Sequence, residues 1–209
     1  MTARPGAGAV VFDLGGVLID WDPRLLYRTL LPEEEVEAFL AEVEFDAWNH
    51  EQDAGRPFAA AVEAHAARFP HRRELLAAYH DRYAETLAGE VPGSVEILGE
   101  LHAAGSVRLV ALTNWSAETF HHARDRFDFL DWFEGIVVSG EERVAKPDPR
   151  IFAILLERFR LEPAGTVFVD DRQVNVDAAA AAGMTAVRFT DAPRLRADLQ
   201  RLGVLADDP

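Results

Sequence analysis

The chain has 209 residues, enough for one large domain or a domain with an insert, and a composition of 49% hydrophobic and 27% charged residues is typical of a globular protein with a full core. Its 36 acidic residues outnumber 21 basic ones, and the resulting net charge of −15 would repel a nucleic-acid backbone. The absence of cysteine excludes disulfides and thiolate chemistry. The sequence shows no apolar run of membrane-spanning length and no secretory signal. We therefore expect a cytoplasmic protein that binds neither membrane nor nucleic acid.

Five short apolar runs predict the strands of the fold. They are rich in valine, isoleucine and leucine, which is typical of strands buried on both faces. In chain order they lie at 9–12, 107–112, 135–138, 166–169 and 185–189. Helical patterns at 94–104, 117–127, 149–159 and 174–182 fall between them. This alternation predicts an α/β fold with a parallel sheet and right-handed crossovers.

Residues 21–92 interrupt the alternation, because they contain no strand-like run. Helical patterns are expected there at 23–30, 33–48, 58–69 and 72–87, and the pair Pro92 and Gly93 marks the return to the sheet. The simplest interpretation is an all-helical domain of residues 21–92 inserted into a core made of residues 1–20 and 93–209.

Polar residues follow the strands at their carboxyl ends, where open parallel sheets bind ligands. They are Asp13, Thr113, Asn114, the loop residue Lys146, and the adjacent pair Asp170 and Asp171. Taken singly, such residues commonly cap helices or form turns. Asp170 and Asp171 are harder to explain in that way, because adjacent carboxylates repel each other unless a cation or hydrogen-bond donors offset them. Together, the residues predict a functional site.

The order of these motifs resembles that of the haloacid dehalogenase superfamily of hydrolases. Four segments carry the resemblance: VFDLGGVL at 11–18, LTN at 112–114, AKPDPRIF at 145–152, and VDD at 169–171 followed by Asn175 and AAGM at 181–184. The resemblance covers almost the whole chain. It implies a Rossmann-like core, with residues 21–92 as the helical cap domain of members related to dehalogenases and sugar phosphatases.

This resemblance implies a phosphatase that acts on a small phosphate ester. Asp13 would be the nucleophile that forms an aspartyl-phosphate, and the carboxylate would need positioning and a partner cation for that task. Thr113 would donate a hydrogen bond to the transferring group, and Lys146 would neutralise its developing charge. The residues expected to bind substrate are Leu14, Gly15, Asn114 and Trp115.

The resemblance also implies Mg²⁺ as the cofactor, a hard cation that prefers oxygen ligands. Asp13, Asp171 and the backbone carbonyl of Gly15 would hold it. Asp170 is a further candidate for the metal shell or for orienting Lys146, and Asn175 is expected to support the ligands from behind.

Gly15 departs from the usual pattern of the superfamily's phosphatases. They carry a second Asp at this position, which protonates the leaving alcohol and later activates water. General acid-base help is worth about 10² to 10⁴ in rate. Either another residue or a water supplies the proton, or the leaving group hardly needs one. His50 is one candidate donor, because a histidine titrates near neutral pH.

Two other functions remain open at this point. One is a 2-haloacid dehalogenase that forms an aspartyl ester without metal, since a departing halide needs no proton; the adjacent carboxylates Asp170 and Asp171 argue against it. The other is a binding protein that keeps the fold without catalysis. Relatives with the same Asp-Leu-Gly opening include phosphatases of sugar 1-phosphates, but no residue specifies the substrate or the oligomeric state.

Overall fold

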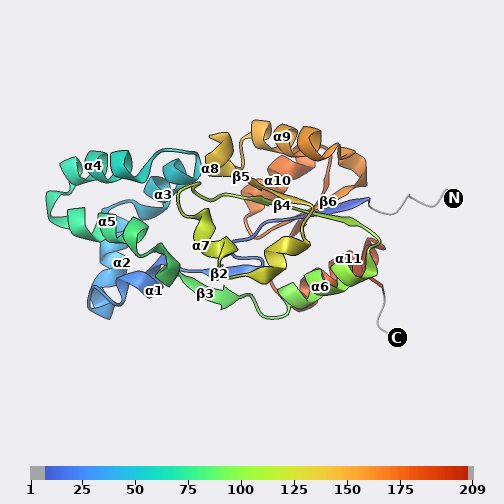
Figure 1. The fold of residues 1–209 in the computed structure, drawn as a ribbon, viewed down its shortest axis with the longest axis horizontal. Helices are drawn as coiled ribbons and strands as arrows, with labels where there is room; N and C mark the ends of the chain where they lie inside the picture. Colours follow the sequence, from blue (N-terminus) through green and yellow to red (C-terminus); the bar gives the residue numbers. More distant parts are fainter. Residues whose placement is uncertain (1–7, 207–209) are drawn as a thin grey trace.

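A five-stranded parallel sheet forms the centre of the computed structural model, which describes residues 8–206 (Figure 1). The strands are β1 (Ala9–Phe12), β4 (Arg108–Thr113), β5 (Gly135–Val138), β6 (Thr166–Asp170) and β7 (Thr185–Arg188). Their spatial order is β5-β4-β1-β6-β7, and every neighbouring pair is parallel. The predicted α/β fold is confirmed, with β1 in the middle of the sheet.

Helices cover both faces of the sheet because its strands are apolar on both sides. Val10 and Phe12 of β1 belong to one core cluster, and Val11 belongs to another on the opposite face. The covering helices are α6 (Ser94–Ala104) and α11 (Ala192–Arg201) with the first cluster, and α9 (Pro149–Phe159) and α10 (Gln173–Ala181) with the second. Figure 1 shows the two pairs on opposite sides of the sheet.

Shorter elements complete the core. They are α7 (Phe120–Arg124), α8 (Ser139–Glu142) and the 3₁₀ turns η3 (Asp128–Trp132) and η4 (Pro163–Gly165). The helix expected at 117–127 is therefore shorter than predicted, and α8 and α11 were not predicted. No helix within residues 8–206 has the length and apolar character needed to cross a membrane.

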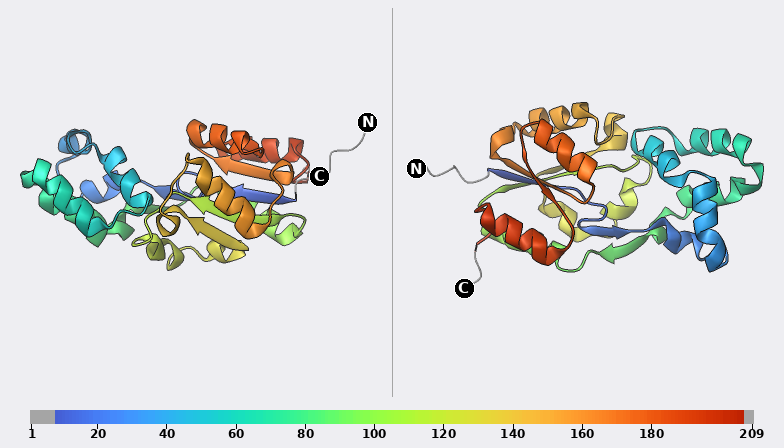
Figure 2. Two further views of the ribbon diagram at one scale, coloured as in Figure 1. Left: turned by 90° about the horizontal axis from the view of Figure 1, so that it is seen from above. Right: turned by 180° about the vertical axis from the view of Figure 1, so that it is seen from behind.

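A group of helices, here called the helical insert (residues 23–86), lies at one end of the molecule, beyond the sheet (Figures 1 and 2). It consists of α1 (Pro23–Tyr27), α2 (Glu33–Glu42), α3 (Phe45–Asp53), α4 (Phe58–Arg68), α5 (Arg73–Asp81), η1 (Pro70–Arg72) and η2 (Tyr83–Thr86). An antiparallel pair, β2 (Ile19–Trp21) and β3 (Leu87–Glu90), connects it to the core. The prediction that 21–92 contains no strand was wrong for β3, because Leu87 pairs with Trp21 and ends the expected helix 72–87 early.

The helix predicted at 33–48 is two helices. Glu44 adopts a left-handed conformation with φ of 51°, which separates α2 from α3. The break turns Phe45 and Trp48 onto Tyr79, with ring centroids 5.0 and 5.8 Å apart. Burial of these aromatic rings favours the break, and α3 then runs on to Asp53, five residues beyond the predicted end.

Candidate active site

The register of the sheet brings the predicted residues together. Phe12 of β1 lies level with Ala111 of β4 and Val169 of β6. Asp13, one residue further, therefore lies at the strand ends beside Asp170. Its backbone N–H donates to the Val169 carbonyl at 2.8 Å, which fixes its position at the carboxyl edge of the sheet, where the sequence predicted the site.

Lys146 joins two of the carboxylates. Its Nζ lies 2.9 Å from Asp13 Oδ2 and 2.7 Å from Asp170 Oδ2, and it donates to the Leu112 carbonyl at 3.0 Å. The side chain is fully buried. Burial alone would lower the pKa of Lys146, but the charges of Asp13 and Asp170 outweigh it and raise that pKa. Lys146 is thus a buried ammonium held directly against the predicted nucleophile.

Asp170 is surrounded by donors. Besides Lys146, the Asn175 side-chain amide donates to its two oxygens at 2.9 and 3.1 Å, and the Arg172 backbone N–H donates at 2.9 Å. Asn175 therefore holds the carboxylate of Asp170 in place. Asp170 in turn orients Lys146, which is one of the two roles that the sequence left open for it.

Thr113 and Asn114 occupy different environments. The Asn114 amide donates to the Lys146 carbonyl at 2.9 Å and accepts from the Lys146 backbone N–H at 2.8 Å, so this side chain holds the main chain of Lys146. The Thr113 hydroxyl is buried and has no hydrogen-bond partner among residues 8–206. A buried hydroxyl without a partner is costly, which fits a hydroxyl that donates to a bound ligand.

The carboxylates fit a hard divalent cation. Asp13, Asp170 and Asp171 each offer an oxygen, and these atoms lie within 4.8 Å of one another. Burial raises the pKa of Asp13 well above its usual range. The charge of Lys146 partly opposes this rise, whereas the charges of Asp170 and Asp171 add to it. Burial and Asp170 also raise the pKa of Asp171. The oxygen-only donor set is the one that Mg²⁺ prefers. The positive charge of the ion would offset the repulsion among the three carboxylates.

The turn after β1 passes close to these carboxylates. Gly16 has a φ of +75°, and a Cβ there would lie 2.9 Å from Asp171 Oδ2, whereas a Cβ at Gly15 would meet no atom within 4 Å. Leu14 donates its backbone N–H to Asp13 Oδ1 at 2.8 Å. The Leu14 side chain is fully buried in the core cluster rather than in the cavity described next, so only its backbone is placed near the site.

A cavity of about 770 Å³ opens onto the cluster, between the core and the helical insert. From the core it is lined by Asp13, Gly15, Gly16, Asn114, Trp115, Lys146, Pro147, Asp171, Arg172, Val174 and Asn175. From the insert and its connecting strand it is lined by Trp21, Asp46, Ala47, Asn49, His50, Asp53 and Tyr83. Trp115, predicted to line the pocket, does so.

Asp53 is one of the lining residues that the sequence did not predict for the site. It ends α3 and is half-buried, and the Asn49 amide donates to its Oδ2 at 3.1 Å. Burial raises the pKa of Asp53 to about 7, against the opposing effects of the Ser116 backbone N–H, Arg172 and Lys146. The spacing of four residues between Asn49 and Asp53 would have placed both on one helix face, had α3 been predicted to reach Asp53.

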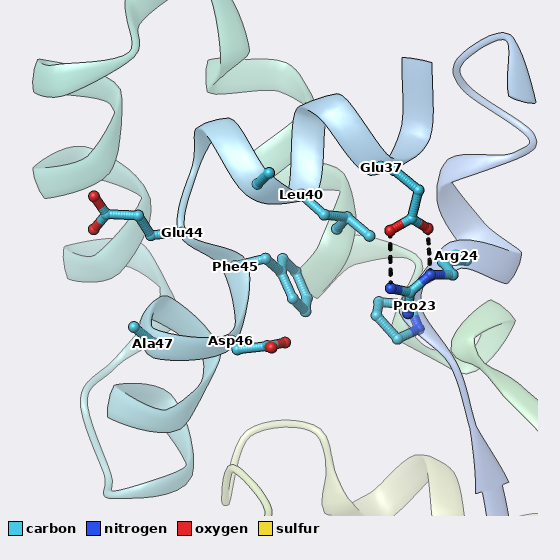
Figure 3. Close-up of a pocket in the computed structure, with 9 residues that line it drawn as sticks. Pro23, Arg24, Glu37, Leu40, Glu44, Phe45, Asp46 and Ala47 are labelled. Carbon is cyan, nitrogen blue, oxygen red and sulfur yellow. Dashed lines mark hydrogen bonds and ion pairs between the residues drawn. The ribbon is translucent and has the colours of Figure 1, made fainter. Parts of the chain in front are cut away.

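A second, smaller cavity of about 400 Å³ lies within the insert (Figure 3). Its polar side comes from the ion pair between Arg24 and Glu37, with Nε and Oε1 2.5 Å apart. Asp46 and Ala47 line both cavities, so the first turn of α3 separates them. The predicted nucleophile and Lys146 line the larger cavity, which is therefore the candidate active site.

Comparison with known proteins agrees with this fold. The family of haloacid dehalogenase-like hydrolases matches residues 7–183, and the chain belongs to this family. A sesquiterpene phosphatase, astK, of Aspergillus oryzae is 29% identical over 202 residues, covering 93% of this chain and 95% of that protein. A phosphorylated carbohydrates phosphatase of Thermotoga maritima is 26% identical, covering 84% and 82%.

Solved structures share the fold. The magnesium complex of a haloacid dehalogenase family enzyme of Bacteroides thetaiotaomicron matches with a TM-score of 0.71 at 21% identity, covering 94% of this chain and 100% of that one. An L-2-haloacid dehalogenase of Xanthobacter autotrophicus, with chloropropionic acid covalently bound, matches at 0.64 and 20% identity, covering 96% and 85%. With its phosphatase relatives, the protein is a hydrolase of the phosphatase type within this family.

Proposed function

We propose that the protein is a Mg²⁺-dependent phosphatase of a small phosphorylated metabolite and works through an aspartyl-phosphate. The observation that carries the proposal is the cluster of buried Asp13 and Asp170, both paired with Lys146, and the half-buried Asp171 beside them. Repulsion among its carboxylates favours a site built around a cation, and the same cluster leaves Asp13 facing the cavity as a nucleophile. The phosphatase relatives support the same conclusion.

In this mechanism, a carboxylate oxygen of Asp13 attacks phosphorus and the bond from phosphorus to the leaving oxygen breaks. Lys146 and Thr113 stabilise the charge on the phosphoryl oxygens. Water then attacks the phosphorus of the aspartyl-phosphate, which releases inorganic phosphate and restores Asp13. Asp13, Asp171 and the Gly15 carbonyl would hold Mg²⁺, which when bound supplies positive charge to the phosphoryl oxygens.

The substrate class follows from the cavity. Its volume of about 770 Å³ exceeds what a phosphoryl group needs, and Trp21, Tyr83 and Trp115 supply aromatic walls for an organic group. The relatives named as phosphatases of phosphorylated carbohydrates and of a sesquiterpene support sugar phosphates, including sugar 1-phosphates, and sesquiterpene phosphates as candidate substrates. In this proposal the helical insert is the cap that covers the site. A cytoplasmic location stays a prediction.

The 2-haloacid dehalogenase is the second candidate, favoured by the likeness to the Xanthobacter structure. Its substrate is an anion that would enter without metal. Lys146 and Asn175 donate to the Asp170 carboxylate, whereas the Asp171 carboxylate forms no ion pair within residues 8–206 and feels Lys146 and Arg172 only as nearby charges. A haloacid carboxylate would therefore face the negative charge of Asp171, which favours the phosphatase.

The first prediction tests this choice. Phosphate esters and 2-haloacids are each incubated with purified protein, with Mg²⁺ and with excess chelator. We expect the protein to hydrolyse phosphate esters, and we expect chelator to stop this hydrolysis and Mg²⁺ to restore it.

The near-isosteric Asp13→Asn should fold normally, by circular dichroism, and lose all measurable turnover, because an amide cannot form the ester. Dehalogenation in excess chelator would instead establish the second candidate.

A further inference from the structure

The cavity places a carboxyl group of the helical insert in the same space as the predicted nucleophile. Asp53 lines it together with Asp13 and Gly15. We propose that Asp53 donates a proton to the leaving group and then accepts one from the attacking water, the task that Gly15 has no side chain to perform. This inference rests on the proposed phosphatase function and adds a catalytic residue to it.

Contacts with the core fix the end of α3 over the site. The Ser139 hydroxyl donates to the Asp53 carbonyl at 2.6 Å and accepts from the Trp115 backbone N–H at 2.9 Å. Trp115 directly follows Asn114, whose amide holds the main chain of Lys146. A short series of hydrogen bonds thus connects Asp53 to the loop that carries the ammonium beside Asp13. The backbone of Asp53 is thus held by Ser139, the first residue of α8, which also bonds the loop after β4.

The carboxyl of Asp53 is oriented but not saturated. The Asn49 amide donates to Oδ2 at 3.1 Å, and the Ser116 backbone N–H also donates to the carboxyl group. Part of the side chain stays open, because Asp53 lines the cavity and is only half-buried. A carboxyl that two donors hold and that is still in part exposed to the cavity has room for a substrate oxygen or a water.

The surroundings of Asp53 suit proton exchange near neutral pH. Lys146 and Arg172 face it and favour the carboxylate, but burial prevails and raises the pKa to about 7. Burial raises the pKa of the Tyr79 and Tyr83 hydroxyls, and the charge of Asp53 raises both further, so they stay neutral. A group that titrates near the working pH is effective both as acid and as base.

The proton balance of the two steps is complete with Asp53 alone. In the first, the bond from Asp13 to phosphorus forms, the bond to the leaving oxygen breaks, and that oxygen takes the Asp53 proton and departs as an alcohol. In the second, water loses a proton to the Asp53 carboxylate as it attacks phosphorus, and the bond to Asp13 breaks. Asp53 ends protonated and Asp13 ionised, as both began.

The neighbouring candidates on α3 are less suitable. Glu51 is exposed, forms an ion pair with Arg56 and does not line the cavity. His50 lines the cavity and is half-buried, but no hydrogen bond orients its ring within the described part of the chain. Glu51→Gln is therefore a matched control for a carboxylate-to-amide change on the same helix, and His50→Gln tests the rival donor.

The experiment compares Asp53→Asn with the wild type on two substrates, p-nitrophenyl phosphate and a simple alkyl phosphate. Rapid mixing with enzyme in excess measures the first release of the leaving group. Steady-state assays measure complete turnover. Nitrophenolate departs without a proton and an alkoxide does not. Release of the alcohol from the alkyl ester should fall by about 10² to 10⁴, and the first release of nitrophenol by less than about tenfold. With excess p-nitrophenyl phosphate, the variant should show a burst of nitrophenol equal to the enzyme and then stall as the aspartyl-phosphate.

A rescue variant separates catalysis from folding. A Cβ at Gly15 meets no atom within 4 Å and its φ is outside the left-handed region, so Gly15→Asp in the Asp53→Asn background should restore a large part of the alkyl phosphate rate. If Asp53→Asn did not fold by circular dichroism, Asp53→Ser would replace it.

With enzyme in excess, equal losses in the release of alcohol and of nitrophenol, no loss of either, or the same selective loss in Glu51→Gln or His50→Gln would overturn the proposal for Asp53. A wild type that hydrolyses no phosphate ester with Mg²⁺ would overturn the proposed function itself, before any variant is made. The two failures are therefore distinguishable.

Discussion

An Asp53 that titrates near neutral pH, as the proposed acid does, lowers the free energy of unfolding once it is ionised. An ionised carboxylate in a buried position is unfavourable, and a rise in its pKa from 3.8 to about 7 corresponds to up to about 4 kcal/mol once the group is charged, at ~1.4 kcal/mol per pKa unit. Residues kept in unfavourable environments are typical of functional sites. Asp53 is therefore expected to destabilise the folded protein at the pH where the enzyme works.

A prediction about stability compares Asp53→Asn with the wild type. The free energy of unfolding of each is measured as a function of pH, with chelator present. Between pH 4 and pH 7 the folded state keeps the Asp53 proton while the unfolded state has released it, so the wild type loses stability as pH rises through this window. Asp53→Asn lacks this loss. The variant should match the wild type near pH 4 and exceed it by up to about 4 kcal/mol at pH 8. A difference that does not change with pH would mean that Asp53 titrates like an ordinary carboxyl group.

At the scale of residues, the sequence predicted the cluster residues that follow strands but not the cavity residue at the end of helix α3. Asp13, Thr113 and Asp171 were predictable because the carboxyl ends of parallel strands converge. Asp53 was not, because its position depends on how the insert folds onto the core. The contact of Asn114 with the Lys146 main chain was also not predictable, since nothing in the spacing of 32 residues indicates that their loops touch.

Among the elements, those with a continuous pattern were predicted best. α6 and α9 begin and end where expected, because Gly105 terminates the first and Asp148 and Pro149 begin the second. The break between α2 and α3 was missed, since Glu44 carries no glycine-like signal for a left-handed residue. β3 was missed because a four-residue strand, LAGE, has neither an apolar run nor clear alternation.

The turn between β1 and β2 gives a prediction at this scale, because its two glycines differ. Gly16 has a left-handed φ and a Cβ there would meet Asp171 Oδ2 at 2.9 Å, whereas Gly15 has open space. Gly16→Ala should therefore lower the free energy of unfolding by about 1–3 kcal/mol and weaken Mg²⁺ binding by displacing Asp171.

Gly15→Ala is the matched control, with the same added methyl one residue earlier. It should change stability by less than about 1 kcal/mol and bind Mg²⁺ as the wild type does. Chemical denaturation and calorimetric titration with Mg²⁺ measure both quantities. Equal effects of the two variants would show that the turn adapts and that Gly16 has no special role beside Asp171.

For the whole molecule, the insert and the core meet through a few directional contacts in addition to the β2–β3 pair. Ser139 bonds the end of α3, and Glu118, in the loop after β4, bonds two further insert helices. Its Oε1 accepts from the Phe58 backbone N–H at 3.0 Å, and its Oε2 lies 3.6 Å from His80 Nε2. The predicted division of the chain at residues 21 and 92 does not locate these contacts, because they join segments far apart in sequence.

The last prediction follows from Glu118. Replacing it with Ala leaves the first N–H of α4 without its side-chain acceptor and removes the carboxylate beside His80 Nε2, which should cost about 1–3 kcal/mol of local stability. Backbone amides at the start of α4 should exchange with solvent faster, and kcat/KM should fall because Asp53 and His50 spend less time over Asp13. Glu118→Gln keeps an acceptor for Phe58 and should lie between Ala and the wild type. Glu141→Ala, an exposed carboxylate of α8, controls for the loss of charge. Unchanged exchange at Phe58 in Glu118→Ala would mean that the other contacts, among them the β2–β3 pair and Ser139, hold the insert against the core without Glu118.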